Sequence, residues 1–227
     1  MKSFILLLSI LFIMITHSQE IITDVSGNTY KTVKIGSQIW MAENLRTEKF
    51  NNGDLIELVT SNRFWQEITF KMMEDETLIY NQPAMCYYNN VKTKDNALYN
   101  WYVINNERNV CPVGWHVPSS SEFMDLITQL GGLELALSKL KDVSSWEING
   151  VNSSGFKGKA VGGRNSDGSF SGETSVAGYW TDTQSGERNP TYNLLMPIAN
   201  LIYIGNNEID LSSGVYNMGS SIRCLKN

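Results

Sequence analysis

One short stretch, from Cys111 to Phe123, places a cysteine beside a helix start and constrains the fold more strongly than composition does. Ser119 has the position of a helix N-cap, because its side chain can accept from the backbone N–H of Glu122 while Glu122 reaches back to the N–H of Ser119. Pro118 and Phe123 stand where a hydrophobic staple closes over the first turn. We therefore expect a rigid corner that leads directly into a helix.

The first 18 residues have the pattern of a secretory signal peptide. Lys2 precedes an apolar run over residues 4–15, and small side chains stand at Thr16 and Ser18. Such a run is too short for a transmembrane helix, which needs roughly 20 residues, and no later segment is long enough. We expect export to remove this segment, so that residues 19–227 form a secreted or cell-surface protein without a transmembrane segment.

The exported chain would have 209 residues, a length typical of one large domain. We expect a single domain over residues 19–227, with an oligomeric state that the sequence does not define. Without Lys2 there are 17 basic and 23 acidic residues, a net charge of −6, and no cluster of Lys and Arg that could follow a phosphate backbone. Nucleic acid is therefore not an expected partner.

His116 is the one histidine that remains after residue 18. This excludes zinc sites that need two or more histidines. A Ser-His-Asp or Cys-His mechanism would have to use His116 alone. Its place inside the corner before the helix cap favours a structural role instead.

The N-terminal half predicts hairpins, an insertion and a first helix. Residues 21–45 alternate weakly around Gly turns, which indicates a small antiparallel sheet. Residues 51–82 show no clear period, and we interpret them as an inserted surface excursion. Residues 97–105 have apolar side chains at helical spacing, with Asp95 as a plausible cap.

The second helix begins at Ser119 and ends at Gly131-Gly132. Its apolar residues, at spacings of 3, 4 and 7, are Phe123, Leu126, Ile127 and Leu130. The same spacing continues over residues 133–140. Residues 150–178 then carry eight glycines, which predicts a long looped region. Short strands are expected after it, at 179–183, 192–196, 201–204 and 220–225.

Three motifs carry a family resemblance: Cys111 to Phe123, Gly162 to Phe170, and Ser221-Ile222-Arg223-Cys224. Together they resemble the Fibrobacter succinogenes major paralogous domain, which is found in secreted proteins of Bacteroidetes and their relatives. The resemblance covers nearly all of residues 19–227. It implies an α+β, C-type-lectin-like fold: two main helices packed on short, mostly antiparallel sheets with long Gly-rich loops. The family has no established biochemical role.

The resemblance also implies a disulfide. In a C-type-lectin-like fold a cysteine after the first helix pairs with one on the last strand, and Cys111 and Cys224 hold those places. Cys86 would then be a free thiol, an intermolecular link, or simply a small buried apolar residue. Trp40, Trp101 and Trp115 are assigned to the interior.

The corner is also similar to the Pro-Thr-x-x-Glu-Trp run of formylglycine-generating enzymes, but those use two nearby cysteines near the chain end, where this chain has only Cys224. The calcium site of lectins is not matched either, because neither Glu-Pro-Asn nor Gln-Pro-Asp occurs. Trp180-Thr181-Asp182 matches half of that site at most, and calcium wants 6 to 8 oxygens. We therefore expect no metal and no cofactor.

The Gly-rich loop offers the candidate ligand site. Arg164, Asn165 and Asp167 could present a guanidinium, an amide and a carboxylate to a ligand. The alternative is a tight turn in which Asn165 or Asp167 bonds its own backbone and Arg164 pairs with a local carboxylate. Tyr179, expected to be exposed, could stack on sugar rings, whereas Trp180 is the more typical core residue; Asp182 completes the set of candidate ligand-binding residues.

These observations favour an extracellular or cell-surface binding module whose ligand is a glycan or a protein, with no catalytic residue assigned. One alternative is an enzyme acting on extracellular polysaccharide, which would need two facing carboxylates about 5 to 10 Å apart. Glu173, Asp182 and Glu187 are its candidates. Another alternative is a purely structural envelope component.

Overall fold

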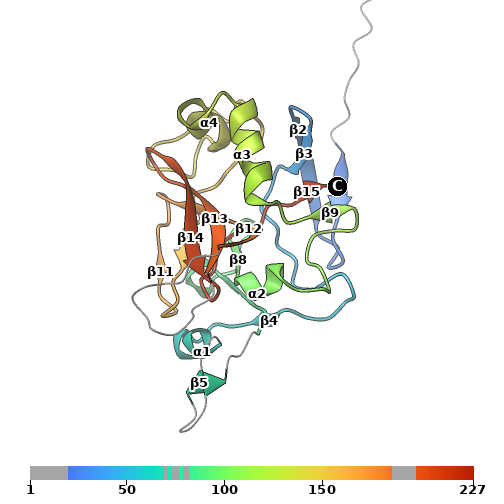
Figure 1. Ribbon diagram of the computed structural model, residues 1–227, viewed down its shortest axis with the longest axis vertical. Helices are drawn as coiled ribbons and strands as arrows, with labels where there is room; N and C mark the ends of the chain where they lie inside the picture. The colour runs from blue at the N-terminus through green and yellow to red at the C-terminus, as the bar shows by residue number, and fades with distance from the viewer. Residues whose placement is uncertain (1–19, 69–70, 73–76, 79–81, 186–197) are drawn as a thin grey trace, which may run out of the picture.

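The computed structural model describes residues 20–68, 71–72, 77–78, 82–185 and 198–227 (Figure 1). The fold is α+β, with mostly antiparallel sheets and few helices. The helical segments are α1 (Asn62–Glu67), η1 (Tyr88–Asn90, a 3₁₀ turn), α2 (Trp101–Ile104), α3 (Ser120–Gln129) and α4 (Leu133–Leu140). None of the described helices is long and apolar enough to cross a lipid bilayer.

The largest sheet has the strand order β1-β2-β3-β15-β9. Its strands are β1 (Ile21–Thr23), β2 (Thr29–Ile35), β3 (Gln38–Met41), β9 (Trp115–His116) and β15 (Leu225–Lys226). The hairpins expected over residues 21–45 are confirmed, with Val33 opposite Trp40 in the register of β2 and β3. Leu225 pairs with Trp40 on one side and with His116 on the other, so the last strand lies inside this sheet.

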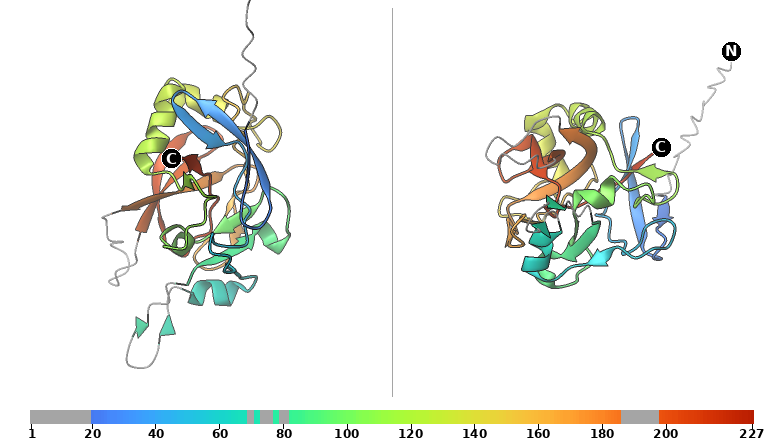
Figure 2. Two further views of the ribbon diagram at one scale, coloured as in Figure 1. Left: turned by 90° about the vertical axis from the view of Figure 1, so that its right-hand side faces the viewer. Right: turned by 60° about the horizontal axis from the view of Figure 1, so that its bottom comes forward.

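A second sheet has the order β12-β13-β14 and lies on the other side of the molecule (Figure 2). Its strands are β12 (Ala177–Ser185), β13 (Ile198–Ile204) and β14 (Ile209–Val215). The strands expected at 179–183 and 201–204 are confirmed within β12 and β13. The strand expected at 192–196 lies outside the described residues, and β14 was not expected because Ser212-Ser213-Gly214 interrupts its apolar pattern.

Three smaller sheets complete the described fold. They comprise β4 (Glu57–Leu58), β7 (Ala84–Tyr87) and β8 (Ala97–Tyr99) in one, β10 (Gly163–Arg164) and β11 (Phe170–Ser171) in another, and β5 (Lys71–Met72) with β6 (Thr77–Leu78) in a third. The β4–β7 pair is parallel, and the others are antiparallel. Short elements joined by loops are what the eight glycines of residues 150–178 indicate.

The corner before α3 forms as its residues predict. The Ser119 side chain accepts from the Glu122 backbone N–H, and Glu122 in turn accepts from the Ser119 N–H at 2.7 Å, which completes a capping box. Gly131 and Gly132 end the helix with φ of 99° and 90°, conformations that L side chains rarely adopt. The continuation is α4, which buries Ala136 and Leu140.

The helix expected over residues 97–105 is wrong in its first half. Residues 97–99 form β8, which pairs with β7, and only residues 101–104 are helical. Asn100 is the N-cap residue, whereas Asp95 forms an ion pair with Lys159 at 2.7 Å. Residues 97–99 pair with β7, and Ala97 and Leu98 are completely buried there. Pairing in the core therefore overrides the local helical spacing.

The insertion over residues 51–82 is more than a surface excursion. Ser61 caps α1, and Trp65 and Ile68 at its end are buried in the core. The short β5–β6 hairpin beyond α1 lies at the end of the molecule far from the N-terminal sheet (Figure 2). The part of the insertion around α1 therefore belongs to the packed fold.

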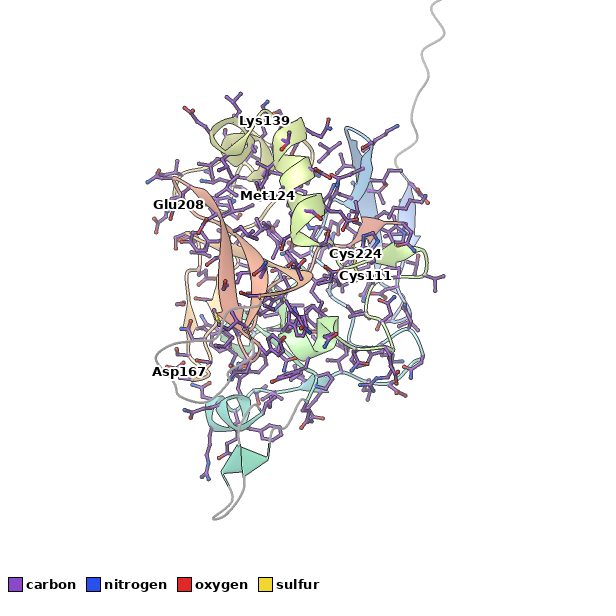
Figure 3. All side chains as sticks on the ribbon, in the orientation of Figure 1. Cys111, Met124, Lys139, Asp167, Glu208 and Cys224 are labelled. Atoms are coloured by element: carbon purple, nitrogen blue, oxygen red, sulfur yellow. A yellow bond between two sulfur atoms is a disulfide. The ribbon has the colours of Figure 1, made fainter. Side chains whose placement is uncertain are left out.

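The disulfide between Cys111 and Cys224 is confirmed, with their Cα atoms 5.9 Å apart (Figure 3). Cys86 is a free, fully buried thiol in the core with Trp65, which is the environment expected of a small buried apolar residue. Burial raises the pKa of the Cys86 thiol to about 11, and the nearby Arg164 guanidinium does not offset this effect. The three tryptophans assigned to the interior, Trp40, Trp101 and Trp115, are all buried.

Candidate functional site

The Gly-rich loop between β10 and β11 folds against the body of the molecule. Its backbone closes through bonds between Asn165 and Ser169 and between Gly168 and Asn165. Gly168 has φ of 87°, and a Cβ at this position would stand 2.6 Å from Cα of Asn62 at the start of α1. Glycine is required here because the loop packs directly on the helix backbone.

Arg164 is enclosed rather than presented to solvent. Its guanidinium donates to the carbonyls of Gly168 at 3.0 Å and Val59 at 2.6 Å, and to Oδ1 of Asn62 at 3.0 Å. It also lies over the ring of Trp65, 4.5 Å from the centroid. The side chain has no exposed surface, so the expected ligand contact is wrong. Burial lowers the pKa of Arg164, yet a guanidinium keeps its charge in proteins.

The two polar neighbours of Arg164 mainly serve the turn. The Asn165 amide donates to the hydroxyls of Ser169 and Ser171, and the Asp167 carboxylate accepts from the backbone and hydroxyl of Ser169. The bonds from Ser169 lower the pKa of Asp167. The structure therefore supports the turn of the alternative, but Arg164 bonds carbonyls and the Asn62 side chain and pairs with no carboxylate of the described residues. Figure 3 shows Asp167 at the edge of the molecule away from the disulfide.

Tyr179 and Trp180 are both buried, so the exposure expected for Tyr179 is wrong. The Tyr179 ring packs edge-on against Phe156, with centroids 5.6 Å apart, while the Trp180 indole N–H donates to the Tyr99 carbonyl at 2.7 Å. Successive residues of a strand face opposite sides of a sheet. Both are covered because β12 has packed core on each face.

Of the three candidates on β12, Tyr179 and Trp180 are buried and Asp182 is exposed. Partial burial raises its pKa, and the nearby Glu122 carboxylate adds to the effect. Glu122 itself bonds Ser119 and lies 3.1 Å from Nε2 of His116. His116 completes the corner by approaching Oδ1 of Asn227 at 2.7 Å through Nδ1. These contacts give His116 a structural role.

The enzyme alternative needs two facing carboxylates among Glu173, Asp182 and Glu187, and the described residues do not provide such a pair. The carboxylate that acts on Asp182 is Glu122, Glu173 is an exposed residue after β11, and Glu187 lies outside the described residues. The described part of the chain also contains no group of three or more His, Cys, Asp or Glu side chains that could hold a metal ion.

Two adjoining cavities form on another part of the surface, beside the segment that follows β3. The first, of about 260 Å³, is lined by Lys31, Ala42, Glu43, Asn44, Lys94, Asp95, Lys157 and Lys159. The second, of about 440 Å³, is lined by Ser26, Asn28, Arg46, Glu48, Tyr87, Lys92, Thr93 and Lys94. Lys94 lines both, and we call the two cavities together the lysine groove.

Segments that are far apart in the sequence form the lysine groove. Strand β2 supplies Lys31, residues 42–48 supply its floor, and the loops at 92–95 and 157–159 supply the walls. Asn44 ties the floor to one wall, because its amide donates to the Asp95 carbonyl at 3.3 Å. Sequence analysis missed this site, since no local spacing connects the lysines.

Ion pairs hold part of the groove in place. Glu43 pairs with both Arg46 and Lys94, at 3.1 and 3.0 Å, and Glu48 pairs with Lys92. Partial burial raises the pKa of Glu43, but the contacts with Lys94 and Arg46 outweigh it and leave the pKa below its ordinary value. The Lys92 ammonium and the Tyr87 hydroxyl likewise lower the pKa of Glu48. These carboxylates therefore stay ionised at neutral pH.

Arg223 is fully buried and bonds two residues that line the first cavity, Asn44 and Lys157. Its guanidinium donates to Oδ1 of Asn44 at 2.5 Å, to the Met41 carbonyl at 3.1 Å and to the Phe156 carbonyl. The carbonyl of Lys157 is a further acceptor, at 3.5 Å. Arg223 thus joins the floor of the groove to one of its walls.

The family model described as the Fibrobacter succinogenes major domain matches residues 33–226. The chain belongs to this family. The match includes the corner, the Gly-rich loop and the terminal Ser221-Ile222-Arg223-Cys224, so the resemblance drawn from these motifs is confirmed. No curated protein and no solved structure matches the chain.

Proposed function

We propose that this member of the Fibrobacter succinogenes major domain family is a secreted or cell-surface binding module that holds an extracellular glycan or protein in the lysine groove. Residues 1–18 serve as its signal peptide, and residues 19–227 form one domain. The proposal assigns no catalytic step.

One observation carries the assignment to the groove. Its charged side chains remain at the surface and line two open cavities, whereas those of the Gly-rich loop are buried or bonded within the turn. Ligand sites are concave and are built from loops on a rigid scaffold. The groove is concave. Its floor is held rigidly, because the backbone N–H groups of Met41 and Leu45 donate to the carbonyls of Cys224 and Ile222 beside the disulfide.

We also propose that the fold is C-type-lectin-like. Two features support this proposal. The helix α3 follows a corner that carries Cys111, and a long looped region then leads to strands that end at Cys224. In this arrangement the disulfide ties the corner to the last strand, as the fold requires.

A glycan-array screen of the exported protein, together with binding to immobilised extracellular proteins, tests the function. Binding should fall when both Lys31 and Lys157 are changed to Gln, since both are exposed groove residues. Lys34→Gln is the matched control, because Lys34 is exposed on the same strand as Lys31 but lines neither cavity. Absence of any ligand, or equal loss with the control, would refute the binding role of the groove. Intact mass of the exported protein tests the cleavage after residue 18.

A further inference from the structure

The lysine groove carries a positive charge on a negatively charged protein. Six cationic side chains line it: Lys31, Arg46, Lys92, Lys94, Lys157 and Lys159. Three carboxylates accompany them: Glu43, Glu48 and Asp95. The groove therefore has a local excess of three positive charges, although the whole chain has a net charge of −5. A local excess of this sign attracts anions.

Two of the six cations remain available to a ligand. Glu43, Glu48 and Asp95 take the other four in ion pairs. Lys31 and Lys157 form no ion pair with any residue the structure describes, and both are exposed. They line the same cavity.

The backbone fixes the base of Lys157 firmly. Lys157 has φ of 56°, a conformation uncommon for a residue with a side chain. Its N–H donates to Oδ1 of Asn152 at 2.9 Å, and its carbonyl accepts from Arg223. Such strained positions cluster at ligand-binding sites. The ammonium ion of Lys157 thus extends from a position that the fold holds in place.

Arg223 adds a further positive charge below the floor. It forms no ion pair with a carboxylate among the described residues and has no exposed surface. Water screens a buried charge poorly. A negative group in the first cavity would therefore interact favourably with Arg223 through Asn44, which lines the cavity and bonds the guanidinium.

The lining of the groove is nearly all polar, which favours a glycan over a peptide as the ligand. Ala42 and Tyr87 are its apolar members. Lys92 covers the Tyr87 ring, 5.4 Å from its centroid, and the Tyr87 hydroxyl bonds Glu48. Peptide-binding sites ordinarily add apolar pockets for side chains, and none is present here. Carboxylates beside the lysines can instead accept bonds from sugar hydroxyls.

From these observations we propose that the ligand is an acidic polysaccharide, whose carboxylate or sulfate groups bind Lys31 and Lys157 while its hydroxyl groups contact Glu43, Glu48 and Asp95. This inference rests on the proposed function, since it names the ligand class of the same groove.

Binding of the purified exported protein to four immobilised polymers tests the proposal. These are polygalacturonate for carboxylated glycans, heparin for sulfated glycans, dextran for neutral glycans and polyglutamate for acidic polypeptides. Binding is expected to polygalacturonate, heparin or both, which identifies the anionic group, and to weaken as NaCl is raised. Lys31→Gln and Lys157→Gln should each raise the Kd about tenfold, the effect of losing a hydrogen bond to a charged group.

Lys34→Gln should change the Kd less than about twofold, because Lys34 makes no groove contact. Thermal unfolding of each variant confirms that the fold is intact. Tighter binding to dextran or equal binding to polyglutamate would overturn the acidic-glycan proposal while the binding function stood. A Kd unchanged by both groove variants would overturn the assignment of the ligand to the groove, and with it both proposals. Failure to bind any polymer, array glycan or extracellular protein would overturn both.

Discussion

Arg164 and Arg223 are two buried guanidinium groups in contrasting surroundings. Each donates to backbone carbonyls, each lies over an aromatic ring, and neither forms an ion pair with a carboxylate of the described residues. Around Arg164 the neighbouring polar side chains satisfy a turn. Arg223 instead bonds Asn44 and Lys157, which line the first cavity together with Lys31 and Lys94.

The comparison separates two uses of a positive charge. Arginine has a planar fork of donors that suits several fixed carbonyls, whereas lysine is a compact charge that stays hydrated. The two arginines therefore join segments inside the protein, whereas Lys31 and Lys157 of the groove remain at the surface without an ion pair to any described residue. In the loop over residues 163–168, the carbonyls of Gly168 and Val59 occupy the guanidinium of Arg164. The loop pattern alone therefore does not indicate a ligand site.

Loss of the disulfide should have the largest effect and should distinguish the two regions. The bond between Cys111 and Cys224 closes a sequence separation of 113 residues on the Arg223 side. Changing both cysteines to Ser should lower the free energy of unfolding by about 4 to 5 kcal/mol, from the greater entropy of the unfolded chain. Urea denaturation measures this change. Cys86→Ala is the control and should lower the free energy of unfolding by only about 1 kcal/mol. Equal losses in the two variants would show that the disulfide does not stabilise the fold by restricting the unfolded chain.

Replacement of Arg223 should affect both stability and binding. Arg223→Met leaves four acceptors on separate segments without their donor, and we expect a loss of about 4 kcal/mol in the free energy of unfolding. Ligand affinity of the folded protein should also fall, because Asn44 and Lys157 lose their common anchor. Unchanged affinity would show that the buried charge does not support the groove.

Arg164→Met tests the opposite side of the comparison. It removes donors from Val59, Gly168 and Asn62, and the expected loss is about 3 kcal/mol in the free energy of unfolding. Affinity for the ligand, measured well below the melting temperature, should stay as in the unaltered protein. A variant of normal stability with weakened binding would instead restore the Gly-rich loop as the ligand site.

Lowering the pH should reduce the free energy of unfolding through Glu43, by less than the arginine substitutions do. Because its pKa is lowered in the folded state, Glu43 contributes stability above its ordinary pKa of 4.5, and the contribution is lost as the pH falls through the lower folded value. Glu43→Gln should cost about 1 kcal/mol at pH 7 and close to nothing at pH 3, as measured by urea denaturation. A difference that persists at pH 3 would contradict the ionic origin.

Local patterns were sufficient for several parts of the fold. Residues 21–41 and the α3 corner formed as expected because turn glycines, a capping box and apolar spacing act over a few residues. The strand at residues 97–99 was missed because pairing with β7, more than ten residues away, decides its conformation. Local spacing around Trp101 correctly indicated a helix only where the chain leaves that pairing.

The candidate site depended on contacts that the sequence does not display. The carbonyls that enclose Arg164 include Val59, more than 100 residues earlier, and the groove collects Lys31 from a strand and Lys94 and Lys157 from two separate loops. Burial of Tyr179 likewise follows from Phe156 and Phe123 on other elements. The glycines predicted a tight loop correctly, but only long-range packing decides which side chains the loop leaves exposed.

The central position of β15 has a consequence for the order in which the protein folds. Residues 219–225 complete the pairing of β3, β9 and β12 and supply both Arg223 and Cys224. A chain that has been synthesised only as far as residue 218 lacks all of these contacts. Such long-range closure slows folding, so we expect the nascent chain to stay unfolded until its last strand emerges. Under the secretion proposed above, that delay would keep the polypeptide unfolded during its passage through an export channel.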